Sequence, residues 1–228
     1  MTPDLGWLIG FTVKMALAGT LLTLPFGILL GLWLARTRWP GRSLVETLAS
    51  LPLVLPPTVV GLALLEIFGR NRPLGRFLYE RFGVSVAFTW RAVVLASAVV
   101  AFPLLVRTVR AAFEGVDPRL PALARTLGRG PLYVFFTVTL PLASRGILAG
   151  AILAFSRALG EFGATIMVAG NIPGETQTMS LAIFQLVSIG RDPDAYRLAL
   201  VSVAVAFVAI WLSEHLVRRS RARLAELS

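Results

Sequence analysis

Long runs without a charged residue are the feature that most constrains this chain. Residues 15–35 contain no Asp, Glu, Lys or Arg, and about 20 apolar residues in an α-helix are enough to cross the ~30 Å hydrocarbon core of a bilayer. Hydrophobic residues make up 56% of the sequence and charged residues 15%, whereas a typical soluble domain is about 25% charged. A water-soluble fold of this size could not bury so much apolar surface, so the sequence predicts an all-α membrane protein.

The apolar runs predict five transmembrane helices in a single domain that covers residues 1–228. The expected spans are about 13–35, 47–66, 84–106, 141–161 and 197–217. Proline removes a backbone donor and kinks a helix, so Pro52, Pro56 and Pro57 predict that the second span is bent or broken. Residues 162–190 hold two shorter apolar pieces separated by Gly and Pro. A folded external loop and a broken, re-entrant segment both fit these pieces.

The charge pattern excludes one class of function and predicts an orientation. The chain has 22 Lys and Arg against 12 Asp and Glu, a formal charge of +10, but these residues lie between apolar runs, which argues against a nucleic-acid-binding protein. Lys and Arg are more frequent in the loops that are cytoplasmic when the N-terminus is outside and the C-terminus inside, as the positive-inside rule favours. The arginines from Arg70 to Arg91 disagree, because they fall on the expected outer side.

Enzymatic and metal-binding motifs are missing from the sequence. It has no cysteine and one histidine, which excludes disulfides, cysteine–zinc sites and iron–sulfur clusters. Lys14 is the single lysine, and the phosphate-binding pattern G-x-x-x-x-G-K-[ST] does not occur. We therefore expect no catalytic residue, metal or cofactor in this chain.

The expected cytoplasmic loop, about 107–140, predicts two short helices. Asp117 is a good N-cap and Pro118 suits the first helical position, which predicts a helix over 117–127. Gly128 can end that helix in the left-handed conformation, and Pro131 can start the next. The apolar stripe of the first helix consists of Leu120, Leu123 and Leu127. Such a stripe docks on the membrane surface, on the chain's own helix ends or in a groove of a partner protein.

This loop resembles the "EAA" loop of bacterial ABC-importer permeases. Gly128, nine further residues and then Val138-Thr139-Leu140-Pro141 match that family's glycine, nine residues and Ile-x-Leu-Pro. Ala122, Leu123 and Ala124 stand where the family has Glu-Ala-Ala, so the acidic residue is missing. We expect Arg125 or Glu114 to supply polar contacts in its place.

Further segments resemble the molybdate branch of the same family: 51–61, 113–120, 124–128, 134–142 and 159–178. The resemblance implies a bacterial inner-membrane permease with its N-terminus outside, whose homodimer forms the pathway for molybdate. It also implies two ABC ATPase subunits that bind ATP and Mg, and an extracytoplasmic oxyanion-binding protein. The short loop helix, called the coupling helix, would sit in a cleft of an ATPase subunit.

Candidate pathway residues lie in the two irregular segments. Arg157 and Glu161 are four residues apart and can pair on one helical face, either at the pathway or as a structural ion pair at a helix end. The proposed lining of the pathway or its gate consists of Pro56, Pro57, Thr58, Gly61, Arg157, Glu161, Gly163 and Thr165. A kink that only shapes packing is the alternative for the second span. Gly27 and Gly31 have the G-x-x-x-G spacing that permits close helix approach.

Two alternative functions stay open. The same architecture could transport tungstate, sulfate or thiosulfate, since molybdate, tungstate and sulfate are tetrahedral dianions. An ATP-independent secondary transporter or channel is the alternative of another class, and its signatures would be inverted repeats and a charged site at the membrane midplane.

Overall fold

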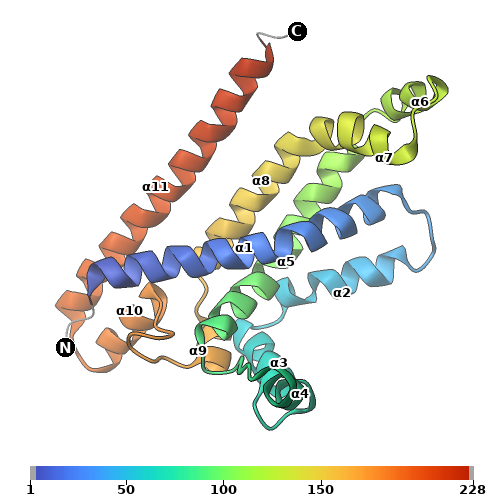
Figure 1. Ribbon diagram of the computed structural model, residues 1–228. Helices are drawn as coiled ribbons and strands as arrows, with labels where there is room; N and C mark the ends of the chain where they lie inside the picture. Colours follow the sequence, from blue (N-terminus) through green and yellow to red (C-terminus); the bar gives the residue numbers. More distant parts are fainter. Residues whose placement is uncertain (1–3, 226–228) are drawn as a thin grey trace.

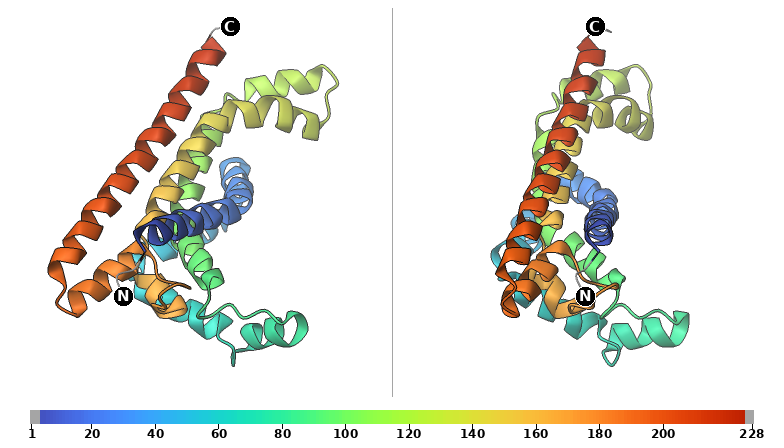
Figure 2. Two further views of the ribbon diagram at one scale, coloured as in Figure 1. Left: turned by 60° about the vertical axis from the view of Figure 1, so that its left-hand side comes forward. Right: turned by 90° about the vertical axis from the view of Figure 1, so that its left-hand side faces the viewer.

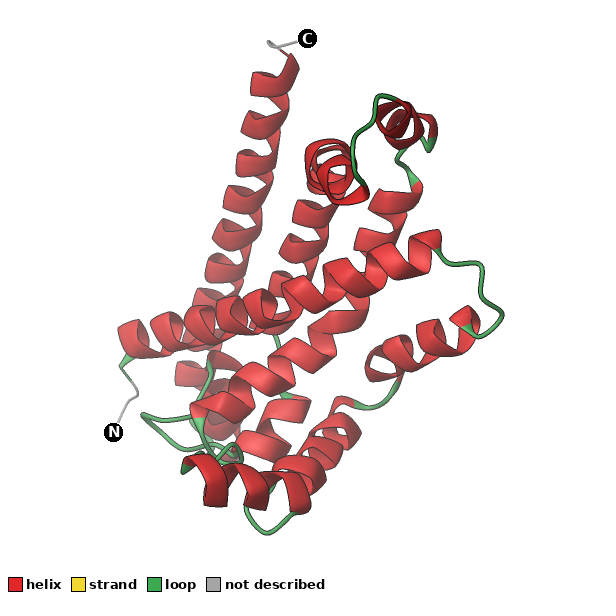
Figure 3. Ribbon diagram, turned by 45° about the vertical axis from the view of Figure 1, so that its right-hand side comes forward, coloured by secondary structure: helices red, strands yellow, loops and turns green. Residues whose placement is uncertain are grey.

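The computed structural model describes residues 4–225, and every regular element in that range is a helix (Figure 3). The elements in chain order are α1 (Leu5–Arg36), α2 (Arg42–Val54), α3 (Pro57–Phe68), α4 (Pro73–Phe82), α5 (Trp90–Glu114), α6 (Arg119–Thr126), α7 (Pro131–Val134), the π-helical turn η1 (Phe135–Thr139), α8 (Leu140–Leu159), α9 (Gly163–Ala169), α10 (Met179–Ser188) and α11 (Asp192–Ala225) (Figure 1). The all-α prediction is confirmed. Residues 1–3 and 226–228 of the expected domain lie outside the described residues.

Within residues 4–225, four helical stretches are long and apolar enough to cross a membrane: α1, α5, the continuous stretch Pro131–Leu159 and the Asp192–Leu212 part of α11. The pair α2 and α3 passes the same test together but is bent by 109°. Counting the bent pair as one span gives the five that the apolar runs predict.

The bend between α2 and α3 follows directly from two consecutive prolines. Pro56 and Pro57 cannot donate backbone hydrogen bonds, and a residue before proline disfavours the helical conformation. Leu55 and Pro56 are accordingly extended, and α3 starts afresh with Pro57 in its first turn. The predicted break is therefore confirmed, while Pro52 lies within α2 without interrupting it.

The helix of the third span differs from the predicted range 84–106 at both ends. It starts only at Trp90, because Gly83 ends α4 in the left-handed conformation (φ +65°) and the Thr89 side chain accepts a hydrogen bond from Arg91 N. It continues to Glu114, so the following loop begins at residue 115 rather than at 107. A scan for uncharged runs stops at the first arginine, whereas the helix continues through it.

The α6–α7 loop and the irregular region around α9 and α10 lie at opposite ends of the molecule (Figures 1 and 2). The loop containing α6 and α7 lies at the same end as the C-terminal part of α11, and α4, α9, α10 and the start of α1 lie at the other (Figures 1 and 2). The start of α1 and the end of α11 therefore lie at opposite ends, as an odd number of spans requires.

Close packing of α1 on α5 forms the centre of the fold. A Cβ atom on Gly27 would lie 2.5 Å from Leu105 Cδ2, and one on Gly31 would lie 2.7 Å from Val109 Cγ1. Small residues let helix backbones approach closely in a membrane, where lipid is as apolar as leucine. The G-x-x-x-G spacing thus marks the contact of α1 with α5, and α8 packs on the other side of the same core.

The replacement Gly31→Val tests this contact. The added methyl groups would collide with Val109 and with the backbone of Arg110, so we expect a loss of about 1–3 kcal/mol of stability. Gly10→Val in the same helix is the matched control, because a Cβ there meets no atom within 4 Å. Thermal unfolding of both detergent-solubilised variants checks the prediction, and equal unfolding midpoints would contradict it.

Candidate functional site

The loop between α5 and α8 is built by the capping residues that the sequence indicates. Asp117 Oδ1 accepts a hydrogen bond from Arg119 N at 2.9 Å, which confirms its capping role, although the helix α6 starts at Arg119 rather than at 117. Gly128 follows α6 in the left-handed conformation with φ +77°, and Pro131 is the first residue of α7. Both are as predicted.

The apolar stripe of α6 is exposed. The exposed fractions of Leu120, Leu123 and Leu127 are 44%, 61% and 80%, so among the described residues the stripe does not pack on the chain's own helix ends. Ala122 is also exposed and Ala124 is half-buried. Of the docking alternatives, the membrane surface and a partner's groove therefore stay open.

The polar candidates of this loop lie in two different places. Arg125 is exposed on α6 and lines a cavity of about 340 Å³ together with Trp33 and Arg36 at the end of α1. Glu114 is instead the last residue of α5, and its carboxylate pairs with Arg110 (2.8 Å) and Arg42 (3.0 Å). The Glu114 side chain is 43% exposed beside these pairs, so the expectation that Glu114 or Arg125 supplies polar contacts to a partner stays a prediction.

Pro141, the last residue of the motif, lies in the first turn of α8 directly after η1. In η1 the Leu140 N–H donates to Phe135 O, five residues back. A π-helical turn of this kind widens a helix locally, next to a proline that cannot donate a bond to the preceding turn. The chain therefore stays helical from Pro131 to Leu159 despite the proline.

The second group of candidates forms the contact between α3 and α9. A Cβ on Gly61 would lie 2.5 Å from Ala164 O, and one on Gly163 would lie 2.8 Å from Pro57 Cβ. The structure thus brings Pro57 and Gly61 of α3 against the start of α9 at Gly163, which is far from them in the sequence. Pro56, Pro57 and Thr58 are exposed, whereas Thr165 is fully buried and its hydroxyl has no hydrogen-bond partner among the described residues.

Arg157 and Glu161 link α8 to α9. The predicted pair is present, with Arg157 Nη1 2.9 Å from Glu161 Oε2. The other carboxylate oxygen accepts a hydrogen bond from Ala164 N at 2.8 Å in the first turn of α9. Because the Glu161 side chain is only 2% exposed, its charge is compensated by these two contacts rather than by water.

A buried polar cluster between α9 and α10 was not anticipated from the sequence. The Gln177 amide donates to Asn171 Oδ1 at 3.0 Å and also to Gln185. Thr12 Oγ1 in α1 accepts a hydrogen bond from Met179 N at 3.0 Å. The sequence signal for this cluster was the presence of Asn and Gln within an otherwise apolar segment. Their hydrogen bonds hold the irregular backbone between α9 and α10 in place.

Four of the five arginines from Arg70 to Arg91 have local partners. Arg72 pairs with Glu66 (2.6 Å) and Arg76 with Glu80 (2.6 Å). The guanidinium of Arg70 lies 4.1 Å from the centre of the Tyr79 ring, and that of Arg91 lies 4.9 Å from the centre of the Trp90 ring.

Comparison with known proteins identifies the architecture. Residues 27–222 match the family described as "Binding-protein-dependent transport system inner membrane component". The chain belongs to this family.

Relatives of this transport component share most of its length. The molybdenum transport system permease protein ModB of Escherichia coli K12 is 49% identical over 213 residues, 93% of each chain. The sulfate transport system permease protein CysT of Salmonella typhimurium is 38% identical over 200 residues, 88% of this chain and 72% of that protein. A crystal structure of a bacterial ABC transporter involved in the import of alginate has a similar fold, with a TM-score of 0.74 and 19% identity over 93% of this chain and 78% of that one. The alginate transporter has also been crystallised with a periplasmic protein bound to an alginate pentasaccharide. ModB and CysT are transport system permease proteins, and this transport component is an integral inner-membrane protein.

The role of Glu161 in this transport component can be tested with two substitutions. Glu161→Ala removes the acceptor for Ala164 N and the partner of Arg157, so we expect it to cost about 1–3 kcal/mol of stability. Glu161→Gln keeps an oxygen that can accept from Ala164 N, so we expect a smaller loss. The measurement is the midpoint of thermal unfolding in detergent, and a lower midpoint for the glutamine variant than for the alanine variant would refute the capping role.

Proposed function

We propose that this chain is the membrane-spanning permease subunit of an ATP-driven importer for molybdate. The observation that carries the proposal is the 49% identity to a molybdenum transport permease over 93% of both chains. On this proposal the N-terminus is outside and the C-terminus inside, so α4, α9 and α10 face the outside and α6 faces the cytoplasm.

ATP hydrolysis takes place in partner chains on this proposal. Two copies of the permease form the pathway, and two ABC ATPase subunits bind ATP and Mg. The exposed stripe of α6 supports docking of this coupling helix in a cleft of an ATPase subunit, as a helix lays its apolar face into a groove. The proposed contacting set is Glu114, Asp117, Ala122, Leu123, Ala124, Arg125, Leu127 and Gly128, with Pro141 holding the loop on α8. Closure of the ATPase dimer then moves two rigid bodies relative to each other and opens the pathway.

We propose that the anion moves along the bent span formed by α2 and α3. An extracytoplasmic binding protein delivers the oxyanion to the outer end of the dimer. The exposed Pro56, Pro57 and Thr58 line the pathway, while Gly61, Gly163, Thr165, Arg157 and Glu161 hold α3, α8 and α9 in position behind them. Glu161 is not a substrate ligand, since a carboxylate repels an anion and its oxygens are already occupied.

Sulfate is a second candidate substrate, because CysT shares 38% identity with this chain. Tungstate and thiosulfate fit the same architecture. The binding protein is the main discriminator among these anions, and competition of unlabelled anions against labelled molybdate in the uptake assay below would rank them.

The Gly128 variant tests docking of the coupling helix. Gly128→Val forces a β-branched residue to φ +77°, although a Cβ there meets no atom within 4 Å. We expect a strain of about 1–2 kcal/mol, a distorted end of α6 and weaker co-purification of the ATPase subunit. Gly130→Val is the matched control, because that site is equally open but has φ −65°. Equal co-purification by both variants would contradict docking through this turn.

Vesicle uptake tests the transport function itself. Permease, ATPase subunit and binding protein reconstituted together should accumulate labelled molybdate when ATP is present on the ATPase side, and omission of the ATPase or of ATP should abolish uptake. Accumulation driven by an ion gradient alone would favour the ATP-independent transporter instead.

A further inference from the structure

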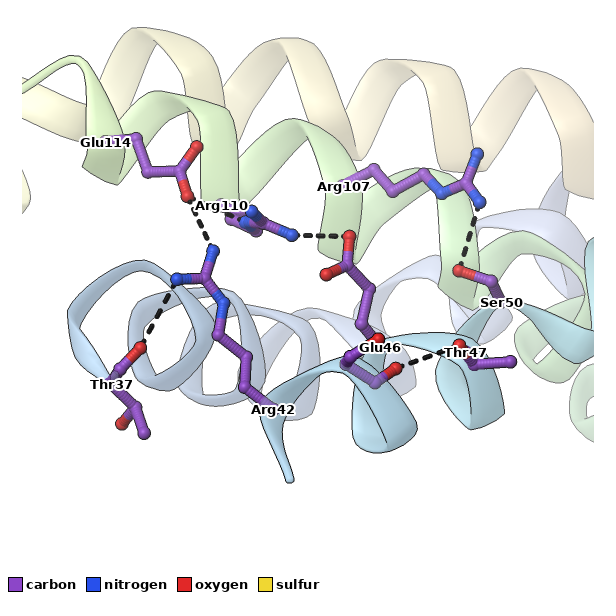
Figure 4. A network of polar contacts seen from close by, with 9 residues as sticks. Thr37, Arg42, Glu46, Thr47, Ser50, Arg107, Arg110 and Glu114 are labelled. Atoms are coloured by element: carbon purple, nitrogen blue, oxygen red, sulfur yellow. Dashed lines mark hydrogen bonds and ion pairs between the residues drawn. The ribbon is translucent and has the colours of Figure 1, made fainter. Parts of the chain in front are cut away.

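The contact between α2 and α5 is a seam of charged and polar side chains (Figure 4). Arg42 Nη2 lies 3.0 Å from Glu114 Oε1, Glu46 pairs with Arg110, and Arg107 Nη2 donates to Ser50 Oγ at 3.1 Å. Residues four apart on α2 therefore meet residues three or four apart on α5, so that each helix presents one face to the other. The α2–α5 seam is defined by Arg42, Glu46, Ser50, Arg107, Arg110 and Glu114.

The seam provides the short-range polar contacts between α2 and α5. Ser50 is the single buried residue of α2, and α5 is the helix with which α2 makes its most extensive contact. No apolar side chain of α2 is buried, and Leu48, Ala49 and Pro52 line an open cavity of about 500 Å³ whose other walls belong to α1 and α5. The ion pairs and hydrogen bonds of the seam are therefore the direct links of α2 to α5.

The seam also lies between the two regions that the transport cycle has to connect. Glu114 is the last residue of α5, and α6 starts at Arg119 after a short turn. At its other end α2 runs into the break before Pro57, and α3 beyond it packs closely on α9. Along the chain the coupling helix leads back to the end of α5, whose polar contacts in the seam reach α2.

We propose that the α2–α5 seam is a rigid link that makes α2 follow the coupling helix, so that movement at α6 shifts the bent span. Two ion pairs cross the contact, Glu46 with Arg110 and Arg42 with Glu114, and Arg110 and Glu114 also pair along α5, so that α2 cannot shift along α5 without breaking directional contacts. The seam residues are positioning residues that contact neither substrate nor nucleotide. This inference rests on the proposed function and adds the route by which ATPase movement reaches the pathway.

Neutral substitutions test the link in the complete reconstituted complex. With Glu46→Gln and with Arg110→Gln, we expect the ATPase subunit to co-purify and ATP hydrolysis to continue, while molybdate imported per ATP falls about threefold or more. Glu80→Gln is the control, because it breaks an ion pair within α4, outside the seam. A ratio that stays unchanged, or uptake and hydrolysis that fall in parallel, would overturn the proposal.

A covalent bridge tests rigidity even if a neutral variant folds poorly. The chain has no cysteine of its own, so Glu46→Cys combined with Arg110→Cys can be joined by a short bifunctional thiol reagent. We expect the unbridged pair to import little molybdate per ATP and the bridged pair to recover at least half of the unaltered ratio. Bridging that blocks uptake would show that α2 and α5 must separate, which contradicts a rigid link. The bridged pair Arg76→Cys with Glu80→Cys on α4 controls for the reagent.

These assays distinguish failure of the proposed transport function from failure of the proposed link through the α2–α5 seam. If the unaltered complex shows no ATP-dependent uptake, the proposed function and the link are both wrong. If the unaltered complex transports and the seam variants keep its ratio of molybdate to ATP, the link alone is wrong.

Discussion

The close contact of α1 with α5 is the interaction on which the rest of the fold depends. In a bilayer there is little hydrophobic gain from bringing helices together, so van der Waals packing and polar contacts must hold them. Gly27 and Gly31 provide the packing, because each leaves room for one α5 side chain. With α1 on one side, α5 is the most enclosed of the membrane-crossing helices, and α8, α2 and α9 assemble around it.

Local patterns in the sequence were sufficient for the helical architecture. Apolar run lengths predicted the spans, Pro56 and Pro57 predicted the break, and Gly128 predicted the left-handed end of α6. The ends of α5 could not be predicted in the same way. Its continuation to Glu114 carries arginines whose partners on α2 are far away in the sequence, and no local window contains both partners.

The candidate site residues show the same difference between local patterns, which the sequence reveals, and contacts between distant residues, which it does not. The pair of Arg157 and Glu161 follows from helical spacing and is confirmed. The second contact of Glu161, with Ala164 N, depends on the turn between α8 and α9, which spacing alone does not specify. The meeting of Gly61 with α9 depends on the 109° bend as well. Sequence reasoning therefore locates the irregular segments but does not give the mutual arrangement of their residues.

The contact of α1 with α5 and the contact of α2 with α5 differ in their chemistry, and we infer that they have different roles. The contact of α1 with α5 is made through glycine and branched apolar side chains, and any shift along it would drive atoms into one another. The contact of α2 with α5 contains ion pairs and a hydrogen bond between side chains, and Ser50 is the one buried residue of α2. Charge-assisted hydrogen bonds are directional, so a displacement of α5 is passed to α2 while the pairs of the seam hold. A bent span that has to follow the end of α5 is therefore better connected through such directional pairs than through apolar side chains alone.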